Sequence, residues 1–411
     1  MVTNNFIKAL SQRRYYGENY FSSFRSWASL SRILLVLFST NITIPLIAKS
    51  GITRKESEKI RTSVIAEWTR DSRQKFDKLF EDVHENGPMI CTERDTMPFW
   101  YTQYGEAPFG ERSLWISLHG GGGTTKEFNN GQWNNQKRLY RPAEGFYVAP
   151  RAPWDAWNMW FQEPIDAMFE ELIQAMIACK GVSPNKIYIL GYSAGGDGVW
   201  RLAPRMADHF AAASMMAGHP GDVRLENLRN LPFMIWCGAK DAAYNRNKEC
   251  EEKDSILDSF QTTDPNGYIH QTNILAEKGH WMNREDTVAI TWMGKFIRNP
   301  YPLSITWRQE EVLRKHFYWI AAPKDELLRG NTVKLSVKKN TIHIEHCDYS
   351  QLTLYLNDEI VNLNKAVTVK RNGKVIFKGK ILRSEQVIKE TLYERGDPQY
   401  CFTAKLQLRL Q

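Results

Sequence analysis

The residues of this chain that most clearly suggest chemistry are Gly191-Tyr192-Ser193-Ala194-Gly195. This stretch follows an apolar run, 186–190, and precedes a segment rich in small residues, 196–213, that we expect to be a helix. A strand, a tight Gly-x-Ser-x-Gly turn and a helix in succession form a nucleophile elbow, which exposes the serine oxygen. The glycines permit this turn because the neighbouring backbone leaves no space for a Cβ. The pattern predicts that Ser193 is a nucleophile rather than a serine that merely caps a helix.

A serine hydroxyl is a weak nucleophile, so a base must remove its proton. His280 follows the last strand expected in this part of the chain and precedes its last helix. That position is the carboxyl edge of a parallel sheet, where α/β proteins place their sites. His219 also follows an expected strand and is the alternative, but it would reverse the usual order of serine, acid and histidine. The order favours His280.

Asp241 is the preferred acid, because it follows the apolar run 233–237 and lies between Ser193 and His280 in the sequence. A carboxylate there would fix the histidine tautomer and stabilise the imidazolium. Asp254 lies within an expected helix and Asp264 in an expected turn, so both are less well placed.

The developing negative charge needs hydrogen-bond donors, and a glycine run supplies candidates. His119-Gly120-Gly121-Gly122-Gly123 follows the apolar run 114–118 directly. Missing side chains let these amides approach a substrate, so Gly120, Gly121 and Gly122 with the amide of Ala194 are the predicted oxyanion hole. A phosphate-binding loop is the other reading, but Gly-Lys-Ser/Thr and a dinucleotide fingerprint are absent from the sequence.

Tryptophans near these motifs are candidates for substrate contacts. Trp154, Trp157 and Trp160 recur every three residues, and Trp281 adjoins the candidate base. Helical spacing makes core packing the default interpretation of the first three. The alternative is an aromatic wall for an acyl or aryl group, with Trp154, Trp157 and Trp281 as its members.

Strands and helices alternate between residues 88 and 302, which we expect to form the domain that positions these groups. The expected strands are 98–103, 114–118, 145–148, 186–190, 211–216, 233–237 and 270–275, and the helices include 164–180, 246–260 and 286–298. Apolar strands that alternate with helices indicate an α/β fold with a doubly wound, mainly parallel sheet covered on both faces.

Three other regions flank this domain. Residues 51–87 contain an amphipathic helix, Arg54 to Val83, that we expect to pack on the next domain as an N-terminal extension. Residues 303–411 form a linker and a small, mostly β domain, in which Asn372-Gly373 is a strong hairpin signal. This domain would bind a polysaccharide or a protein partner, or stiffen the α/β domain.

Residues 1–50 do not have the pattern of a folded domain. Basic residues precede a short apolar run, 33–48, which is typical of a secretory signal with a long basic region. An uncleaved anchor and a buried helix are the alternatives, since the run is shorter than the ~20 residues that a spanning helix prefers. We expect export or association with the cell envelope, with membrane contact through this segment.

Composition excludes several other classes. The chain has 411 residues, 42% of them hydrophobic and 24% charged, and a formal net charge of +8. Because the basic residues are interspersed with acids, we expect no nucleic-acid partner. The six cysteines include no C-x-x-C pair, which argues against a zinc ribbon or a thioredoxin-type site. We expect no metal.

Taken together, these motifs resemble the α/β-hydrolase superfamily. The glycine run after His119 and the elbow around Ser193 are most similar to secreted esterases of the polyhydroxybutyrate-depolymerase-like and feruloyl types and to related predicted peptidases. The longer run 191–220 resembles uncharacterised bacterial hydrolases with a β-rich C-terminal extension. The resemblance implies Ser193, Asp241 and His280 as a triad, and it implies no metal and no organic cofactor. Dienelactone hydrolases, which are related, carry cysteine at the elbow, so Ser193 argues against their chemistry.

The resulting expectation is a serine hydrolase that cleaves a small-molecule or polymeric carboxylic ester through an acyl-enzyme. A serine peptidase of the same fold is the first alternative, because the same triad serves both reactions. A non-catalytic binding protein on a hydrolase fold is the second, since a fold alone does not decide function.

Overall fold

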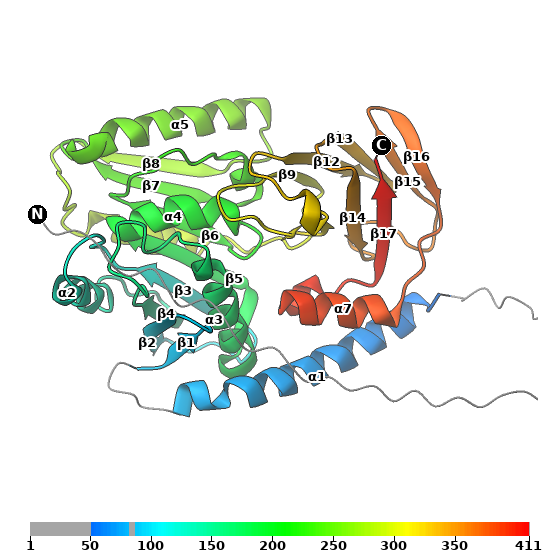
Figure 1. Cartoon of the computed structure of the whole chain (residues 1–411), viewed down its shortest axis with the longest axis horizontal. Helices are drawn as coiled ribbons and strands as arrows, with labels where there is room; N and C mark the ends of the chain where they lie inside the picture. Colours follow the sequence, from blue (N-terminus) through cyan, green and yellow to red (C-terminus); the bar gives the residue numbers. More distant parts are fainter. Residues whose placement is uncertain (1–50, 82–86, 411) are drawn as a thin grey trace, which may run out of the picture. The chain divides into compact units, whose positions relative to one another are not determined.

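A computed structural model of the chain describes residues 51–81 and 87–410, which belong to one compact unit (Figure 1). The predicted signal or anchor segment, residues 1–50, lies outside the described residues. None of the described helices is both long and apolar enough to cross a membrane.

An eight-stranded sheet forms the centre of the α/β part, in the order β1-β2-β4-β3-β5-β6-β7-β8. The pairs β1–β2 and β2–β4 are antiparallel, and all other neighbours in this sheet are parallel. The strands are β1 Met89–Cys91, β2 Thr96–Tyr104, β3 Arg112–Leu118, β4 Gly145–Pro150, β5 Val182–Tyr192, β6 Ala212–Met216, β7 Phe233–Gly238 and β8 His270–Leu275. The predicted mainly parallel sheet is therefore confirmed.

Helices cover both faces of this sheet. Successive side chains of each strand point to opposite faces, so each face has its own apolar core. In β3, Leu114 and Ile116 join an apolar core that includes side chains of α3, α4 and α5. Trp115 of the same strand joins a second core with side chains of α2 and α6. The helices are α2 Lys126–Gln136, α3 Pro164–Lys180, α4 Ala194–Arg205, α5 Arg246–Thr263 and α6 Val288–Met293. This is the doubly wound arrangement that the sequence predicts.

Three helices differ from the sequence expectation. α4 ends at Arg205, well before residue 213, and contains Pro204, which lacks an N–H, in its last turn. α6 is shorter than expected, because a 3₁₀ turn occupies Glu285–Thr287 before it and the helix ends at Met293, with Gly294 as its C-cap. α2 was not expected, because its sequence has few apolar residues; Thr125 begins it by accepting a hydrogen bond from the amide of Phe128.

The C-terminal part contains two further sheets, as its alternating pattern predicts. One has the order β10-β11-β14-β17 and the other β16-β15-β13-β12-β9. The turn at Asn372-Gly373 joins β15 to β16, and both residues have positive φ. The elements are β9 Ser304–Arg308, β10 His316–Phe317, β11 Ile320–Ala321, β12 Thr332–Lys338, β13 Thr341–Cys347, β14 Gln351–Leu356, β15 Val367–Arg371, β16 Lys374–Gly379, α7 Glu385–Arg395 and β17 Ala404–Arg409.

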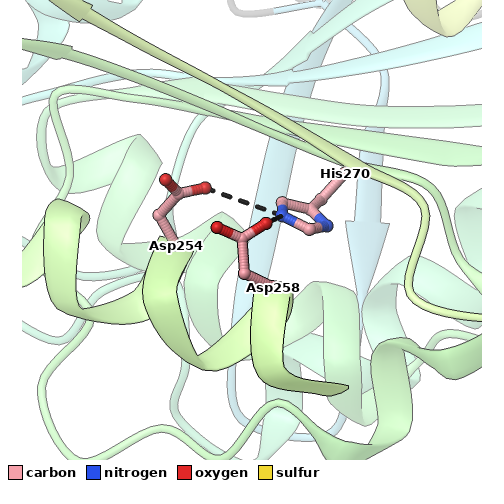
Figure 2. Close-up of side chains that lie close together, drawn as sticks. All are labelled: Asp254, Asp258 and His270. Carbon is pink, nitrogen blue, oxygen red and sulfur yellow. Dashed lines mark hydrogen bonds and ion pairs between the residues drawn. The ribbon is translucent and has the colours of Figure 1, made fainter. Parts of the chain in front are cut away.

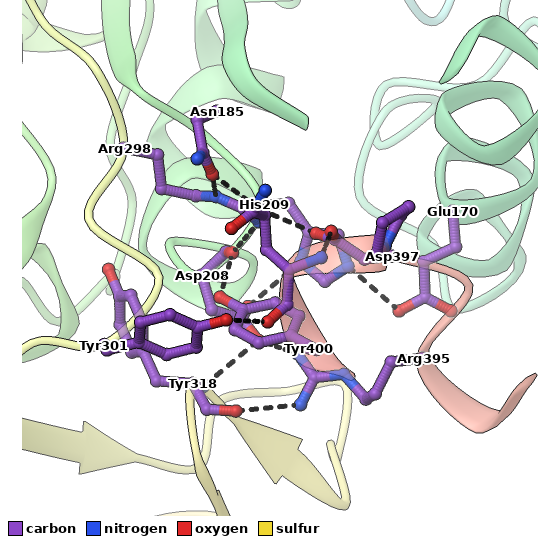
Figure 3. A network of polar contacts seen from close by, with 12 residues as sticks. Glu170, Asn185, Asp208, His209, Arg298, Tyr301, Tyr318, Arg395, Asp397 and Tyr400 are labelled. Carbon is purple, nitrogen blue, oxygen red and sulfur yellow. Dashed lines mark hydrogen bonds and ion pairs between the residues drawn. The ribbon is translucent and has the colours of Figure 1, made fainter. Parts of the chain in front are cut away.

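A buried polar network joins the C-terminal part to the α/β part (Figure 3). Asp208, which follows α4, accepts hydrogen bonds on its carboxylate from Arg395 at 2.6 Å and from the amide of Tyr318 at 3.3 Å. Its backbone oxygen accepts from Arg298 at 2.7 Å and from the hydroxyl of Tyr400 at 2.6 Å. The Asp208 side chain is fully buried. Because one apolar core also runs through both parts, the β-rich region is packed as an extension of the α/β core.

Helix α1 (Arg54–Glu81) begins where the sequence predicts and contacts both parts. Arg73 donates to the backbone oxygen of Ala178 at the end of α3, at 2.8 Å. Asp71 accepts from the hydroxyl of Tyr393 in α7, also at 2.8 Å. Trp68 is almost completely buried. The helix therefore bridges α3 and α7, as Figure 1 shows.

Candidate active site

Ser193 occupies the turn between β5 and α4, with φ of 57° and ψ of −122°. A non-glycine residue rarely adopts this backbone conformation, which costs on the order of 1–3 kcal/mol where the surrounding structure imposes it. The flanking glycines are required sterically. A Cβ on Gly195 would lie 2.1 Å from the backbone oxygen of Leu118, and one on Gly191 would lie 2.3 Å from that of Gly195. The elbow geometry expected from the sequence is present.

The structure brings Ser193, His280 and Asp241 together in one chain of hydrogen bonds. The Nε2 of His280 lies 2.9 Å from the Oγ of Ser193, and its Nδ1 lies 2.7 Å from Oδ2 of Asp241. A carboxylate only accepts, so Nδ1 carries the proton and Nε2 presents its lone pair to the serine hydroxyl. The Asp241 side chain is 2% exposed, whereas that of His280 is 44% exposed. A buried acid thus orients an accessible imidazole.

Tyr192 holds the loop that carries His280, a role that its sequence did not reveal. Its hydroxyl donates to the backbone oxygen of His280 at 2.7 Å and accepts from the amide of Met282 at 3.0 Å. Because Tyr192 immediately precedes Ser193, the elbow and the histidine loop are fixed to each other directly. On the acid side, Nη1 of Arg246 lies 3.4 Å from Oδ1 of Asp241.

The alternatives to His280 and Asp241 bond to other groups. The Nδ1 of His219 accepts from the amide of Gly221 at 3.0 Å, and its own amide donates to Asp197. Asp264 forms an ion pair with Arg229 at 2.7 Å, and Asp254 projects from α5 toward His270. None of the three takes part in the hydrogen bonds of Ser193 that the structure describes.

His119 shapes the start of the glycine loop from within the core. Its Nδ1 lies 2.6 Å from the backbone oxygen of Gly120, and the amide of Ala152 donates to its Nε2 at 3.1 Å. Burial lowers the pKa of His119 to about 3, so the ring is neutral and donates through Nδ1. The planar peptide between Gly120 and Gly121 then directs the N–H of Gly121 away from this ring.

Asn129 of α2 clamps the middle of the same loop. Its Oδ1 accepts from the amide of Gly122 at 2.9 Å, and its Nδ2 donates to the oxygen of Gly122 at 3.0 Å. The N–H of Gly122 is therefore already used, which contradicts its predicted role as an oxyanion donor. A Cβ on Gly120 would lie 3.2 Å from the Cβ of Ser193, so the loop passes close to the elbow. Ser193 is the N-cap of α4, and Ala194 is its first residue. The amide of Ala194 is therefore one of the N-terminal amides that have no partner within the helix.

Two cavities meet at Ser193. The first, which we call the α2-side cavity, has a volume of about 630 Å³, and the second, the α4-side cavity, about 680 Å³. The α2-side cavity is lined by Gly120, Gly121, Phe128, Gln132, Asn135, Gln136, Arg138, Leu139, Tyr192, Ser193, His280, Trp281 and Arg284. The α4-side cavity is lined by Gly121, Gly123, Trp157, Phe161, Ser193, Ala194, Asp197, Arg201, His219, Gly221, Asp222, Tyr244 and Arg246. The hydroxyl is thus open to a substrate on two sides.

The predicted aromatic residues divide between these cavities and the core. Trp281 is 50% exposed and lines the α2-side cavity, and Trp157 is 70% exposed and lines the α4-side cavity. Trp154 lines neither cavity, because its indole N–H donates to Asp95 and its ring packs against the core. Trp160 is fully buried and donates to the backbone oxygen of His119.

Among the described residues, one group has side chains that could hold a metal ion (Figure 2). None of its three residues lines either cavity. Asp254 and Asp258 project from α5 toward His270 of β8, and each offers one atom within 4.8 Å of the others. The Nδ1 of His270 donates to the backbone oxygen of Tyr268, and its Nε2 lies 3.2 Å from Asp258. Contacts of the ring with the two carboxylates and with the backbone oxygen account for this arrangement.

No protein-family model matches the chain, and no curated protein matches it. Similar solved structures include a thermostable esterase, 18% identical over 51% of this chain and 62% of that one, with a TM-score of 0.41. A ferulic acid esterase is 16% identical over 50% of this chain and 95% of that one, with a TM-score of 0.38. A carboxylesterase from Mesorhizobium loti is 18% identical over 51% of this chain and 99% of that one, with a TM-score of 0.35.

The sheet topology and the elbow define the class of fold without these likenesses. A mainly parallel sheet carries helices on both faces, and a strained Gly-x-Ser-x-Gly turn joins one of its central strands to a helix. Asp241 and His280 follow Ser193 in the sequence, and the fold brings all three together at the carboxyl edge of the sheet. The fold is an α/β-hydrolase fold.

Proposed function

We propose that this chain is a serine hydrolase that cleaves a carboxylic ester through an acyl-enzyme. The observation that carries the proposal is the continuous hydrogen-bonded chain from Asp241 through His280 to Ser193, at a point where two cavities meet. An imidazole oriented in this way removes the proton from the hydroxyl as it attacks a carbonyl. The buried carboxylate of Asp241 then stabilises the imidazolium.

In the reaction that we propose, Ser193 Oγ bonds to the carbonyl carbon, and its proton passes to Nε2 of His280. The carbonyl oxygen becomes an oxyanion, for which we assign the N–H groups of Gly121 and Ala194 as donors. His280 returns the proton to the leaving alkoxide, which departs as an alcohol. Water, deprotonated by the same imidazole, then releases the acid and restores the serine.

Labelling by a fluorophosphonate, followed by ester hydrolysis, tests this function on the full chain. We expect the parent protein to be labelled and to hydrolyse short-chain 4-nitrophenyl esters. Ser193→Ala should lose labelling, and its kcat should fall by roughly 10³-fold or more, as for other triads. Ser255→Ala is the matched control, since that serine is exposed on α5 and bonds only to its own helix.

The outcome of this test also separates the alternatives. Turnover of matched amides at rates comparable to those of the esters would indicate a peptidase instead. If the parent is neither labelled nor active on any ester or amide, the binding-protein alternative replaces the proposal. The exported or anchored location rests on residues 1–50 alone and stays a prediction of the sequence.

A further inference from the structure

The two cavities beside Ser193 differ in how their positive charges are neutralised. In the α4-side cavity, Arg201 lies 2.7 Å from Asp222 and Arg246 lies 3.4 Å from Asp241. Both of its guanidinium groups therefore already have carboxylate partners. The α2-side cavity also contains two guanidinium groups, those of Arg138 and Arg284, but no carboxylate lines it among the described residues.

Neither Arg138 nor Arg284 forms an ion pair within the part of the chain that the structure describes. The acidic residues that follow Arg284 in the sequence have other groups as their direct partners, although the Asp286 carboxylate lies near enough to Arg284 for their charges to interact. Glu285 pairs with Lys278 at 2.8 Å, and Asp286 accepts from the buried hydroxyl of Tyr140. The α2-side cavity, which also contains the candidate nucleophile, is therefore lined by two positive charges.

The position of Arg284 is fixed by an unusual backbone. Asn283 and Arg284 have φ values of 54° and 67°, so two successive non-glycine residues are left-handed. Residues with a side chain rarely adopt this conformation, so the surrounding contacts must hold it. The guanidinium group of Arg284 donates to the backbone oxygen of Leu139, at 3.1 Å. This contact links the histidine loop to the segment after α2 and holds Arg284 at the cavity.

We propose that the α2-side cavity is an anion subsite, in which Arg138 and Arg284 bind a carboxylate on one half of the ester. This inference rests on the proposed function and deepens it by naming the substrate class. Phe128 and Trp281 are about half exposed and line the same cavity, so they supply an apolar wall for the body of that half. The substrate is an ester whose acyl or alcohol part has an apolar or aromatic body and ends in a carboxylate.

Two matched pairs of substrates test the subsite on the full chain. Mono-4-nitrophenyl glutarate against 4-nitrophenyl valerate places the charge in the acyl half. 4-Acetoxybenzoate against 4-acetoxybenzamide places it in the alcohol half. We expect a higher kcat/KM for the charged member of one pair, and we expect the preference to shrink in high salt because these arginines are exposed.

Charge-removing variants assign the preference to the two arginines. Arg138→Gln and Arg284→Gln should each reduce the preference, the ratio of kcat/KM for the charged ester to that for its neutral partner, about fivefold, and the double variant roughly 25-fold. Arg141→Gln is the matched control, because that exposed arginine stacks on Tyr104 and does not line the cavity.

Equal kcat/KM values for both members of both pairs would overturn the subsite and leave the hydrolase proposal standing. A loss in the double variant that is the same for charged and neutral esters would also overturn it, since it would indicate damage to the fold. No hydrolysis of any ester, with no fluorophosphonate labelling, would overturn both proposals together.

Discussion

Replacing Asp208 with asparagine tests how firmly the β-rich part is joined to the α/β part. The carboxylate is fully buried and accepts from Arg395 and from the amide of Tyr318, while its Oδ1 lies 3.0 Å from Nδ1 of His209 (Figure 3). Asp208→Asn keeps the size of the side chain but removes its charge and turns one acceptor into a donor. Arg395 then keeps a buried positive charge without its closest partner.

The magnitude follows from these contacts. Hydrogen bonds to charged groups contribute about 1.5–3 kcal/mol each, and breaking a buried ion pair costs about 3–5 kcal/mol. We expect the free energy of unfolding to fall by about 4 kcal/mol, a change of roughly a thousandfold in the unfolding equilibrium constant. Urea denaturation followed by tryptophan fluorescence measures this loss.

Asp222→Asn is the matched control for charge removal. Asp222 also lies between two arginines, Arg201 and Arg329, both at 2.7 Å, but its side chain is 65% exposed. Exposed ion pairs contribute about 0–1 kcal/mol, so this variant should lose less than about 1 kcal/mol. If Asp208→Asn loses no more than Asp222→Asn, the reasoning about the buried network is wrong.

The dependence of the free energy of unfolding on acidic pH gives a second test of the role of Asp208. The arginines and His209 around Asp208 hold the pKa of its carboxyl far below the ordinary value, although burial alone would raise it. A depressed pKa in the folded state contributes stability above the unfolded pKa of about 3.9. That stability is lost as the pH falls below this value. The parent should therefore lose stability more steeply below pH ~4 than Asp208→Asn does.

Three further substitutions test other parts of the structure. Gly121→Ala should lower kcat by roughly 100-fold or more, since its Cβ would lie 2.0 Å from Oδ1 of Asn129 at a φ of +107°, whereas Gly131→Ala, with open space around it, should not. Tyr192→Phe should lower kcat about tenfold with little change in KM, because the loop of His280 loses two hydrogen bonds; an unchanged kcat and pH profile would contradict this role. Burial, with Glu311 nearby, raises the pKa of Glu310 to about 7. The folded state therefore favours the protonated carboxyl, and the free energy of unfolding should fall as the pH rises from about 4.3 through 7. In urea titrations, Glu310→Gln should be stabilising at pH 8 but neutral at pH 4.

The sequence by itself determined the fold class and the identity of the elbow. Alternating apolar runs and helices predicted the parallel sheet, and Gly191 and Gly195 marked the turn around Ser193. These features depend on neighbours along the chain, through strand periodicity and the steric limits of one turn. The order of Ser193, Asp241 and His280 was also readable, because strand ends of a parallel sheet meet at one edge.

Tertiary structure alone decided which amides of the glycine loop remain free and which groups hold the site. Asn129 takes the amide of Gly122, and Tyr192 reaches across 88 residues of sequence to hold His280. Asp208 meets Arg395 across 187 residues, and this contact packs the β-rich part against the α/β core. Two of these hydrogen bonds join segments that are distant in the sequence, and the bond of Asn129 joins the glycine loop to a helix that the sequence did not predict. No local pattern announces such a bond, because its geometry exists only after the chain has folded.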